Sequence, residues 1–190
     1  MMTIQTLSSR RTFMRGTGHA MLSAAAVSVL GGMATSASAA VTSGDVDILN
    51  IALALEHEAI DAYQIGAESG LLQQAVLGVA VTFQSHHKAH RDALIGAVQQ
   101  MGGAAVAAKS RAEYAAALNV AAITGQADIL RLAQRLERGA ANAYLSVIPS
   151  FDNRDLAQVA GKLASDETAH WALLSSVLGD ALPATPFVVS

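Results

Sequence analysis

Apolar positions recur at helical spacing along four long stretches of the chain, and no stretch shows the alternation that is typical of strands. Glycine or proline follows the end of each stretch, as expected where a helix stops. We therefore predict four helices, over about residues 47–68, 71–101, 127–147 and 155–178. The Ala-rich segment 104–125 is only weakly amphipathic, and we expect one short helix there, over about 111–118. The pattern predicts an all-α four-helix bundle.

The same two-helix pattern occurs twice in the chain. Residues 55–63 and 136–144 both read Leu-Glu-x-x-Ala-x-x-Ala-Tyr. About as far downstream of each, a second pair of segments aligns: residues 85–90 read Ser-His-His-Lys-Ala-His, and residues 165–170 read Ser-Asp-Glu-Thr-Ala-His. Such self-similarity indicates an internal duplication of a two-helix unit.

Each unit places polar side chains on the apolar face of its helices. The first helix of each unit carries a Glu, and the second carries two polar residues three positions apart, the latter a His. Residues i and i+3 of a helix point the same way. Glu167 and His170 lie at helical spacings from Leu163, Leu174 and Val177, so we expect both to point inward. Buried Glu and His side chains need partners.

This ordered set of motifs resembles the ferritin-like family, in which two helices each give a Glu and two each give Glu-x-x-His, all directed into the bundle. The resemblance covers nearly the whole chain after its amino-terminal segment. It implies an antiparallel bundle with a long crossover between the second and third helices. Carried over position by position, it implies a metal site of six residues: Glu56, His87, His90, Glu137, Glu167 and His170.

One position departs from the family pattern. His87 stands where the first unit should supply a Glu, unless the frame shifts by one turn to Gln84 and His87; the alignment with Glu167 favours the first frame. With three glutamates and neutral histidines, two divalent ions would leave a net charge of +1. This favours a single divalent ion, or a mixed or less redox-active pair, over a pair that cycles to the ferric state. Imidazole and carboxylate suit iron, manganese and zinc alike, and iron is our first expectation.

Other polar residues receive weaker roles. Tyr63 and Tyr144 lie two turns beyond Glu56 and Glu137 on the same faces, where each either hydrogen-bonds a ligand carboxylate or is an ordinary interior tyrosine. With iron and oxygen present they are also candidates for electron transfer. Glu58 is the alternative ligand if the register of Glu56 is wrong. We expect the remaining polar residues near the motifs to be solvated: His57, Glu58, Asp61, His86, Asp166 and the stripe Arg131, Arg135 and Arg138.

Residues 1–39 read as an export signal, which leaves residues 40–190 as one ferritin-like domain. Residues 9–14, Ser-Arg-Arg-Thr-Phe-Met, resemble a twin-arginine signal, and Ala-Ser-Ala at 37–39 is a small-residue cleavage site. The mildly apolar run 20–33 is shorter than the ~20 residues that span a bilayer. We therefore expect cleavage and a periplasmic protein without a stable membrane anchor, which acquires its metal before export.

Charge and composition exclude several functions. Removal of Arg10, Arg11 and Arg15 from the 12 basic residues leaves 9 against 15 acidic ones, a formal charge of −6. This balance argues against a nucleic-acid partner. The chain has no Cys, which excludes disulfides, thiolate metal sites and Cys nucleophiles.

Two functions remain compatible with the sequence. The first is an exported metal-binding protein with a degenerate di-metal site, which oxidises ferrous iron or removes peroxide. The second is a non-catalytic ferritin-like protein of the envelope with a stress-protective or interaction role. Fold resemblance does not choose between them. A homo-oligomer is open in both cases.

Overall fold

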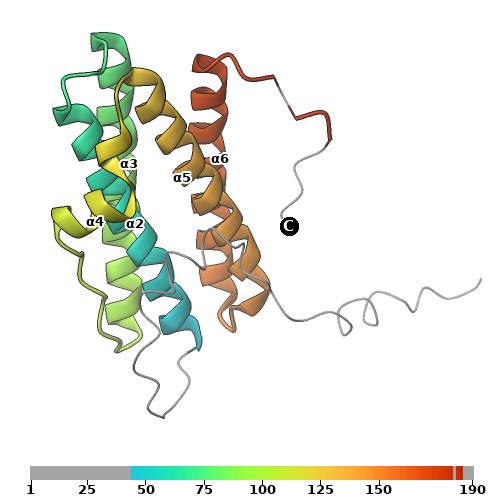
Figure 1. Ribbon diagram of the computed structural model, residues 1–190. Helices are drawn as coiled ribbons and strands as arrows, with labels where there is room; N and C mark the ends of the chain where they lie inside the picture. Colours follow the sequence, from blue (N-terminus) through green and yellow to red (C-terminus); the bar gives the residue numbers. More distant parts are fainter. Residues whose placement is uncertain (1–43, 182, 186–190) are drawn as a thin grey trace, which may run out of the picture.

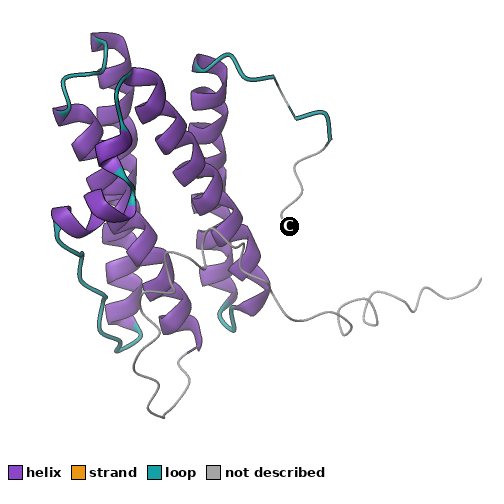
Figure 2. Ribbon diagram, viewed as in Figure 1, coloured by secondary structure: helices purple, strands orange, loops and turns teal. Residues whose placement is uncertain are grey.

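The structure, a computed structural model, describes residues 44–181 and 183–185. Four long helices form the bundle: α2 (Gly44–Glu68), α3 (Gln74–Gln100), α5 (Gln126–Val147) and α6 (Arg154–Val177). Figure 2 shows helices and loops, and the described residues contain no strand. The predicted all-α bundle is confirmed, and every predicted helix end lies within one turn of the observed one. The predicted export signal lies outside the described residues.

The duplicated units are two helical hairpins. α2 packs along α3, α5 packs along α6, and α2 also lies beside α5 (Figure 1). The long crossover between the hairpins contains α4 (Arg111–Ala117) and the short 3-10 helix η3 (Val120–Ala122). Ser110 caps α4 in a reciprocal capping box with Glu113. The short helix that we expected in this segment is therefore confirmed.

The crossover covers the outer flank of α2, which corrects one expectation. The Asn50 side chain donates to the Ala104 carbonyl (3.0 Å) and accepts from the Val106 backbone N–H (2.8 Å). His57 Nε2 lies 3.2 Å from the Val106 carbonyl oxygen, and Glu58 is only 4% exposed. The expectation that Glu58 is solvated was wrong, because a weakly amphipathic segment gives no sign of the flank it will cover. Burial raises the pKa of the Glu58 carboxyl, and the Lys109 charge opposes this.

The buried apolar residues form two separate clusters, one toward each end of the bundle. The Leu53 core contains Val46, Leu49, Ala52, Leu53, Leu94, Val98, Tyr144, Leu156, Leu163 and Ala164. The Phe83 core contains Tyr63, Ala80, Phe83, Leu130, Ala133 and Leu174. Leu163 and Leu174 are buried as expected, whereas Val177, in the last turn of α6, is 52% exposed. None of the described helices is long and apolar enough to cross a membrane.

Candidate metal centre

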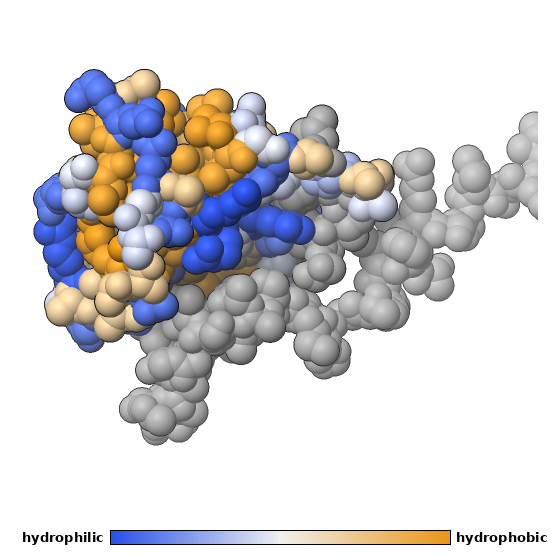
Figure 3. Space-filling view, turned by 45° about the horizontal axis from the view of Figure 1, so that its top comes forward, coloured by the Kyte–Doolittle hydropathy of each residue, from blue (hydrophilic) through white to orange (hydrophobic). Residues whose placement is uncertain are grey.

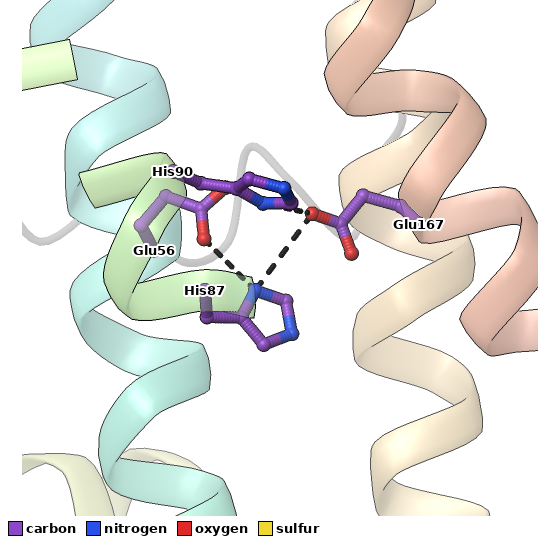
Figure 4. Close-up of side chains that lie close together, drawn as sticks. All are labelled: Glu56, His87, His90 and Glu167. Atoms are coloured by element: carbon purple, nitrogen blue, oxygen red, sulfur yellow. Dashed lines mark hydrogen bonds and ion pairs between the residues drawn. The ribbon is translucent and has the colours of Figure 1, made fainter. Parts of the chain in front are cut away.

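A cluster of buried polar side chains lies between the two apolar cores. The structure brings all six predicted site residues together there, and each is at most 7% exposed. α2 and α5 give one carboxylate each, whereas α3 and α6 give two side chains each. Figure 4 shows Glu56, His87, His90 and Glu167, with Glu167 reaching from α6 toward the two histidines of α3. The inward register of Glu56 is the one that the sequence predicted, and Glu58 is not part of the cluster.

His87 occupies the middle of the cluster. Its Nδ1 lies 2.8 Å from Glu56 Oε2, and its Nε2 lies 3.2 Å from Glu137 Oε1. One imidazole therefore joins the carboxylates of the first helices of both units. Burial alone would lower the pKa of His87, but its two carboxylate partners raise it well above its ordinary value. Without a cation, His87 is thus an imidazolium that donates from both ring nitrogens.

His90 and His170 each turn Nδ1 inward and Nε2 outward. His90 Nδ1 lies 3.1 Å from Glu167 Oε1, and His170 Nδ1 lies 3.2 Å from Glu167 Oε2 and 3.3 Å from Glu137 Oε2. Burial lowers the pKa of both rings, and hydrogen bonds to the carboxylates outweigh it. The resulting pKa is about 10 for His90 and about 9 for His170. At neutral pH and without a metal, both rings are therefore imidazolium ions with a proton on each nitrogen.

Two residues that we expected on the surface lie within hydrogen-bond distance of these outward nitrogens. Asp166 Oδ2 lies 3.2 Å from His90 Nε2, and His86 Nδ1 lies 3.0 Å from His170 Nε2. His86 and Asp166 are indeed exposed, but each contacts the site histidine of the other unit. The internal alignment pairs position 86 with position 166, so this signal was present in the sequence. Such partners fix the ring orientation of a metal-binding histidine.

The two tyrosines cross between the units. The Tyr63 hydroxyl donates to Glu137, and the Tyr144 hydroxyl donates to Glu56. Each tyrosine therefore holds the glutamate of the other unit, as an antiparallel pairing of α2 with α5 requires. Burial and the neighbouring carboxylates raise the pKa of both hydroxyls well above 10, so both stay neutral donors. Of the two interpretations made from sequence, the hydrogen bond to a site carboxylate is the one observed.

The three carboxylates differ in their response to burial. Burial raises the pKa of Glu56 and Glu137, but their histidine partners outweigh it and the net pKa is lowered. For Glu167 burial prevails, and the pKa is raised. In the metal-free cluster, three protonated histidines balance the charge of three carboxylates. A buried ionic network of this kind is a poor source of stability compared with apolar packing, whereas its donor atoms suit a cation that would replace the protons.

The donor atoms form two overlapping groups. Glu56, His87, His90 and Glu167 present one set of ligand atoms within 4.8 Å of one another. His87, Glu137, Glu167 and His170 present the other. A carboxylate has two oxygens and can serve both groups, but a neutral imidazole has a single lone-pair nitrogen and serves one cation at a time. The geometry therefore fits one fully coordinated ion, or an unequal pair that shares Glu167. The role of the six residues as metal ligands stays a prediction.

Comparison with known proteins agrees with this fold. Residues 44–180 match the ferritin-like domain family, and the chain belongs to that family. A crystal structure of a conserved hypothetical protein from Mycobacterium tuberculosis is similar, with a TM-score of 0.61 and 25% sequence identity. The similarity covers 73% of this chain and 100% of the other. No match was found among curated proteins.

Proposed function

We propose that this ferritin-like protein binds one or two divalent cations at its central cluster, iron before manganese or zinc. The observation that carries the proposal is the convergence of three carboxylates and three imidazoles from four helices at a buried point between two apolar cores. Buried charges in proteins are paired or bind metals. The hydroxyls of Tyr63 and Tyr144 also hold Glu137 and Glu56 in place by hydrogen bonds, as partners of metal ligands do.

The activity that we propose for this site is the oxidation of ferrous iron as substrate, bound singly or as an unequal pair. Two ferrous ions give up one electron each. With dioxygen as oxidant, the two electrons and two protons produce hydrogen peroxide; with peroxide as oxidant, they produce two molecules of water. Glu56, Glu137 and Glu167 supply the charge that attracts the substrate, and the histidines release their protons as the cation arrives.

A non-catalytic envelope protein is the second candidate, and one observation favours it. Every carboxylate and every imidazole of the cluster has a hydrogen-bonding partner within hydrogen-bond distance. The metal-free fold is therefore satisfied without a cation. In this alternative the bundle has a stress-protective or interaction role, and the cluster is a relic of the family's metal site.

We also propose that the protein is exported by the twin-arginine route to the periplasm. The paired Arg10 and Arg11 and the small residues at 37–39 support this. Export after folding would allow the cation to be bound in the cytoplasm. Fractionation of cells that express the full chain, compared with an Arg10→Lys, Arg11→Lys double variant, tests the route. Retention of both forms in the cytoplasm would contradict it.

The deciding experiment is metal analysis of the protein purified from cells grown with mixed metals. We expect near-stoichiometric metal in the native protein and a large loss in Glu137→Gln and His170→Ala. Asp92→Asn, a change of an exposed acid on α3, is the control and should retain the metal. If the native protein is metal-free and does not load with ferrous, manganous or zinc ions while remaining folded, the metal-binding proposal fails and the non-catalytic alternative stands.

A further inference from the structure

Two apolar cavities lie at equivalent places in the duplicated units, but they differ in size. The cavity in the Phe83 core has a volume of about 40 Å³, and the cavity in the Leu53 core has about 10 Å³. Apart from Phe151, every residue that lines the smaller cavity aligns with one that lines the larger. Tyr144 corresponds to Tyr63, for example, and Leu94 corresponds to Leu174. The larger cavity is therefore a local departure from an otherwise repeated core.

Two of the aligned lining positions carry a smaller residue in the first unit. Gly66 takes the place of Val147, and Val76 takes the place of Leu156. A Cβ atom at Gly66 would lie 3.1 Å from the Ile129 side chain, so the glycine allows α5 to come close to α2. Glycine inside a helix lowers helix stability. The close approach of α5 is a structural reason for glycine at this position. In the other unit, the larger Val147 side chain and Phe151 line the smaller cavity.

The lining of the larger cavity determines what it can hold. It is aliphatic and aromatic, and the hydroxyl of Tyr63 already donates to Glu137. A buried water needs polar partners, and apolar cavities stay dry. The volume exceeds the ~10–15 Å³ that one water-sized molecule needs and is far below the ~150 Å³ of a cavity that admits benzene. A diatomic apolar molecule matches both limits.

The cavity also lies between solvent and the metal cluster. On its inner side, the Tyr63 ring stacks on His87 with centroids 5.4 Å apart, and the Phe83 ring stacks on His170 at 3.9 Å. On its outer side, its lining includes half-buried Leu72 and the crossover residues Val120 and Ile123. Figure 3 turns this end of the bundle toward the viewer, and apolar residues gather on its surface.

We propose that the cavity in the Phe83 core binds dioxygen and that dioxygen reaches the metal cluster from it, past Tyr63 and Phe83. This inference rests on the proposed function in so far as it names the source of the oxidant. Binding of the gas in the cavity does not require a metal. It is therefore tested on metal-free protein, where its failure is distinct from a failure of metal binding.

The test is methyl NMR of the metal-free protein under raised dioxygen pressure, with dinitrogen at the same pressure as the diamagnetic control. Dioxygen is paramagnetic and accelerates the relaxation of nearby methyl groups. We expect a several-fold larger effect at the methyls of Leu130, which line the larger cavity, than at those of Leu49, their buried counterparts in the Leu53 core. Equal effects at the two leucines would overturn the proposal.

Two reciprocal variants sharpen the test. Val76→Leu copies Leu156 and should reduce the effect at Leu130 to the level at Leu49. Leu156→Val copies Val76 and should raise the effect at Leu49 while leaving Leu130 unchanged. Dispersed methyl spectra show that each variant is folded. An unchanged Leu130 signal in folded Val76→Leu would overturn the proposal; if that variant does not fold, the Leu49 signal in Leu156→Val decides in the same way.

A second readout connects the cavity to the cluster. In protein loaded with ferrous iron, Val76→Leu should slow dioxygen consumption without changing the metal content, because the residue lies outside the ligand cluster. Unchanged consumption together with a reduced NMR effect would show a gas site that does not supply the cluster, which contradicts the second half of the proposal.

Discussion

The two units of the duplication share their helices, their glutamate, their tyrosine and their last histidine, but they differ within one turn of the second helix. α3 has His86 and His87 where α6 has Asp166 and Glu167. Both differences replace a carboxylate by an imidazole, and both fall on residues that contact the cluster. The site is therefore asymmetric although the two hairpins repeat: the first unit contributes more imidazoles and the second more carboxylates.

The position of His87 shows what this asymmetry does. Its ring lies between Glu56 and Glu137, so one imidazolium forms ion pairs with the glutamates of both units. A glutamate at this position would instead place four carboxylates in one buried site. With His87 in place of the glutamate of the family pattern, the cluster has three carboxylates and three imidazoles, and it lacks one carboxylate that two cations could share.

The largest effect on stability and metal content should come from giving the first unit the glutamate that the second unit has. In His87→Glu, we expect the metal-free protein to lose about 3–5 kcal/mol of unfolding free energy, because an ion-paired buried group is replaced by an unpaired charge. Loading with a divalent metal should recover most of that loss, and the metal content should approach two ions per chain. Urea denaturation with and without metal, together with metal analysis, measures both.

The reciprocal variant Glu167→His is the control for that result. It makes the units equal in the other direction, with fewer carboxylates, and should lower the metal content. If His87→Glu changes neither the stability of the metal-free protein nor the metal content, the central role assigned to His87 is wrong.

The pH dependence of stability should distinguish the metal-free from the metal-loaded protein. His90 and His170 contribute one raised pKa from each unit, about 10 and about 9, above the ordinary 6.5. Their stabilising contribution is present below pH 6.5 and is lost as the pH rises through those values. We expect the metal-free protein to lose about 2–3 kcal/mol between pH 7 and 10, reduced from the full shifts because Asp166 beside His90 is open to water.

The metal-loaded protein should lose less over the same range, because its histidines bind as neutral ligands. Glu56 and Glu137 act in the opposite direction at acidic pH. Because their pKa values are lowered, their stabilising contribution is lost as the pH falls and they take up protons. Chemical denaturation at a series of pH values checks both limbs. Identical profiles with and without metal would show that the histidines do not exchange protons for a cation.

The crossed tyrosines test whether the units are still equivalent away from the divergent turn. Tyr63→Phe and Tyr144→Phe each remove one hydrogen bond to a buried carboxylate, at a cost of about 2 kcal/mol in the metal-free protein. We expect similar losses in the two variants, measured by urea denaturation. A loss in only one of them would show that the asymmetry of α3 has spread to the helices that carry the glutamates.

Sequence periodicity and the duplication predicted most of this arrangement. The helices follow from apolar spacing, and the six cluster residues follow from aligning the units and from the family resemblance. The burial of Glu58 was not predictable, because it depends on where a weakly amphipathic crossover packs. The exposure of Val177 has a similar origin: periodicity gives the direction of a side chain but not the extent of the core that it meets.

The contacts of His86 and Asp166 show a different limit of sequence reasoning. Each was assigned to the surface from its position beside an inward residue, and each is in fact exposed. An exposed side chain can still contact the outer edge of a buried ring. The internal alignment pairs the two positions, but their contacts with the outward nitrogens of His170 and His90 depend on how α3 packs against α6.

These two positions give the smallest and most specific prediction. Asp166→Asn removes a charged acceptor from His90 Nε2, and we expect metal affinity to fall about tenfold, the lower end of the effect of such partners, because the Asp166 side chain is 58% exposed. His86→Asp should strengthen affinity instead, since it gives His170 the carboxylate partner that His90 already has. Titration with a divalent metal measures both. Because both changes lie on exposed side chains, unfolding free energies should stay within about 0.5 kcal/mol of native, so a change in affinity reports on ring positioning and not on the fold. Equal affinities in all three proteins would mean that the outward partners do not orient the histidines, and the difference between the units would then rest on His87 alone.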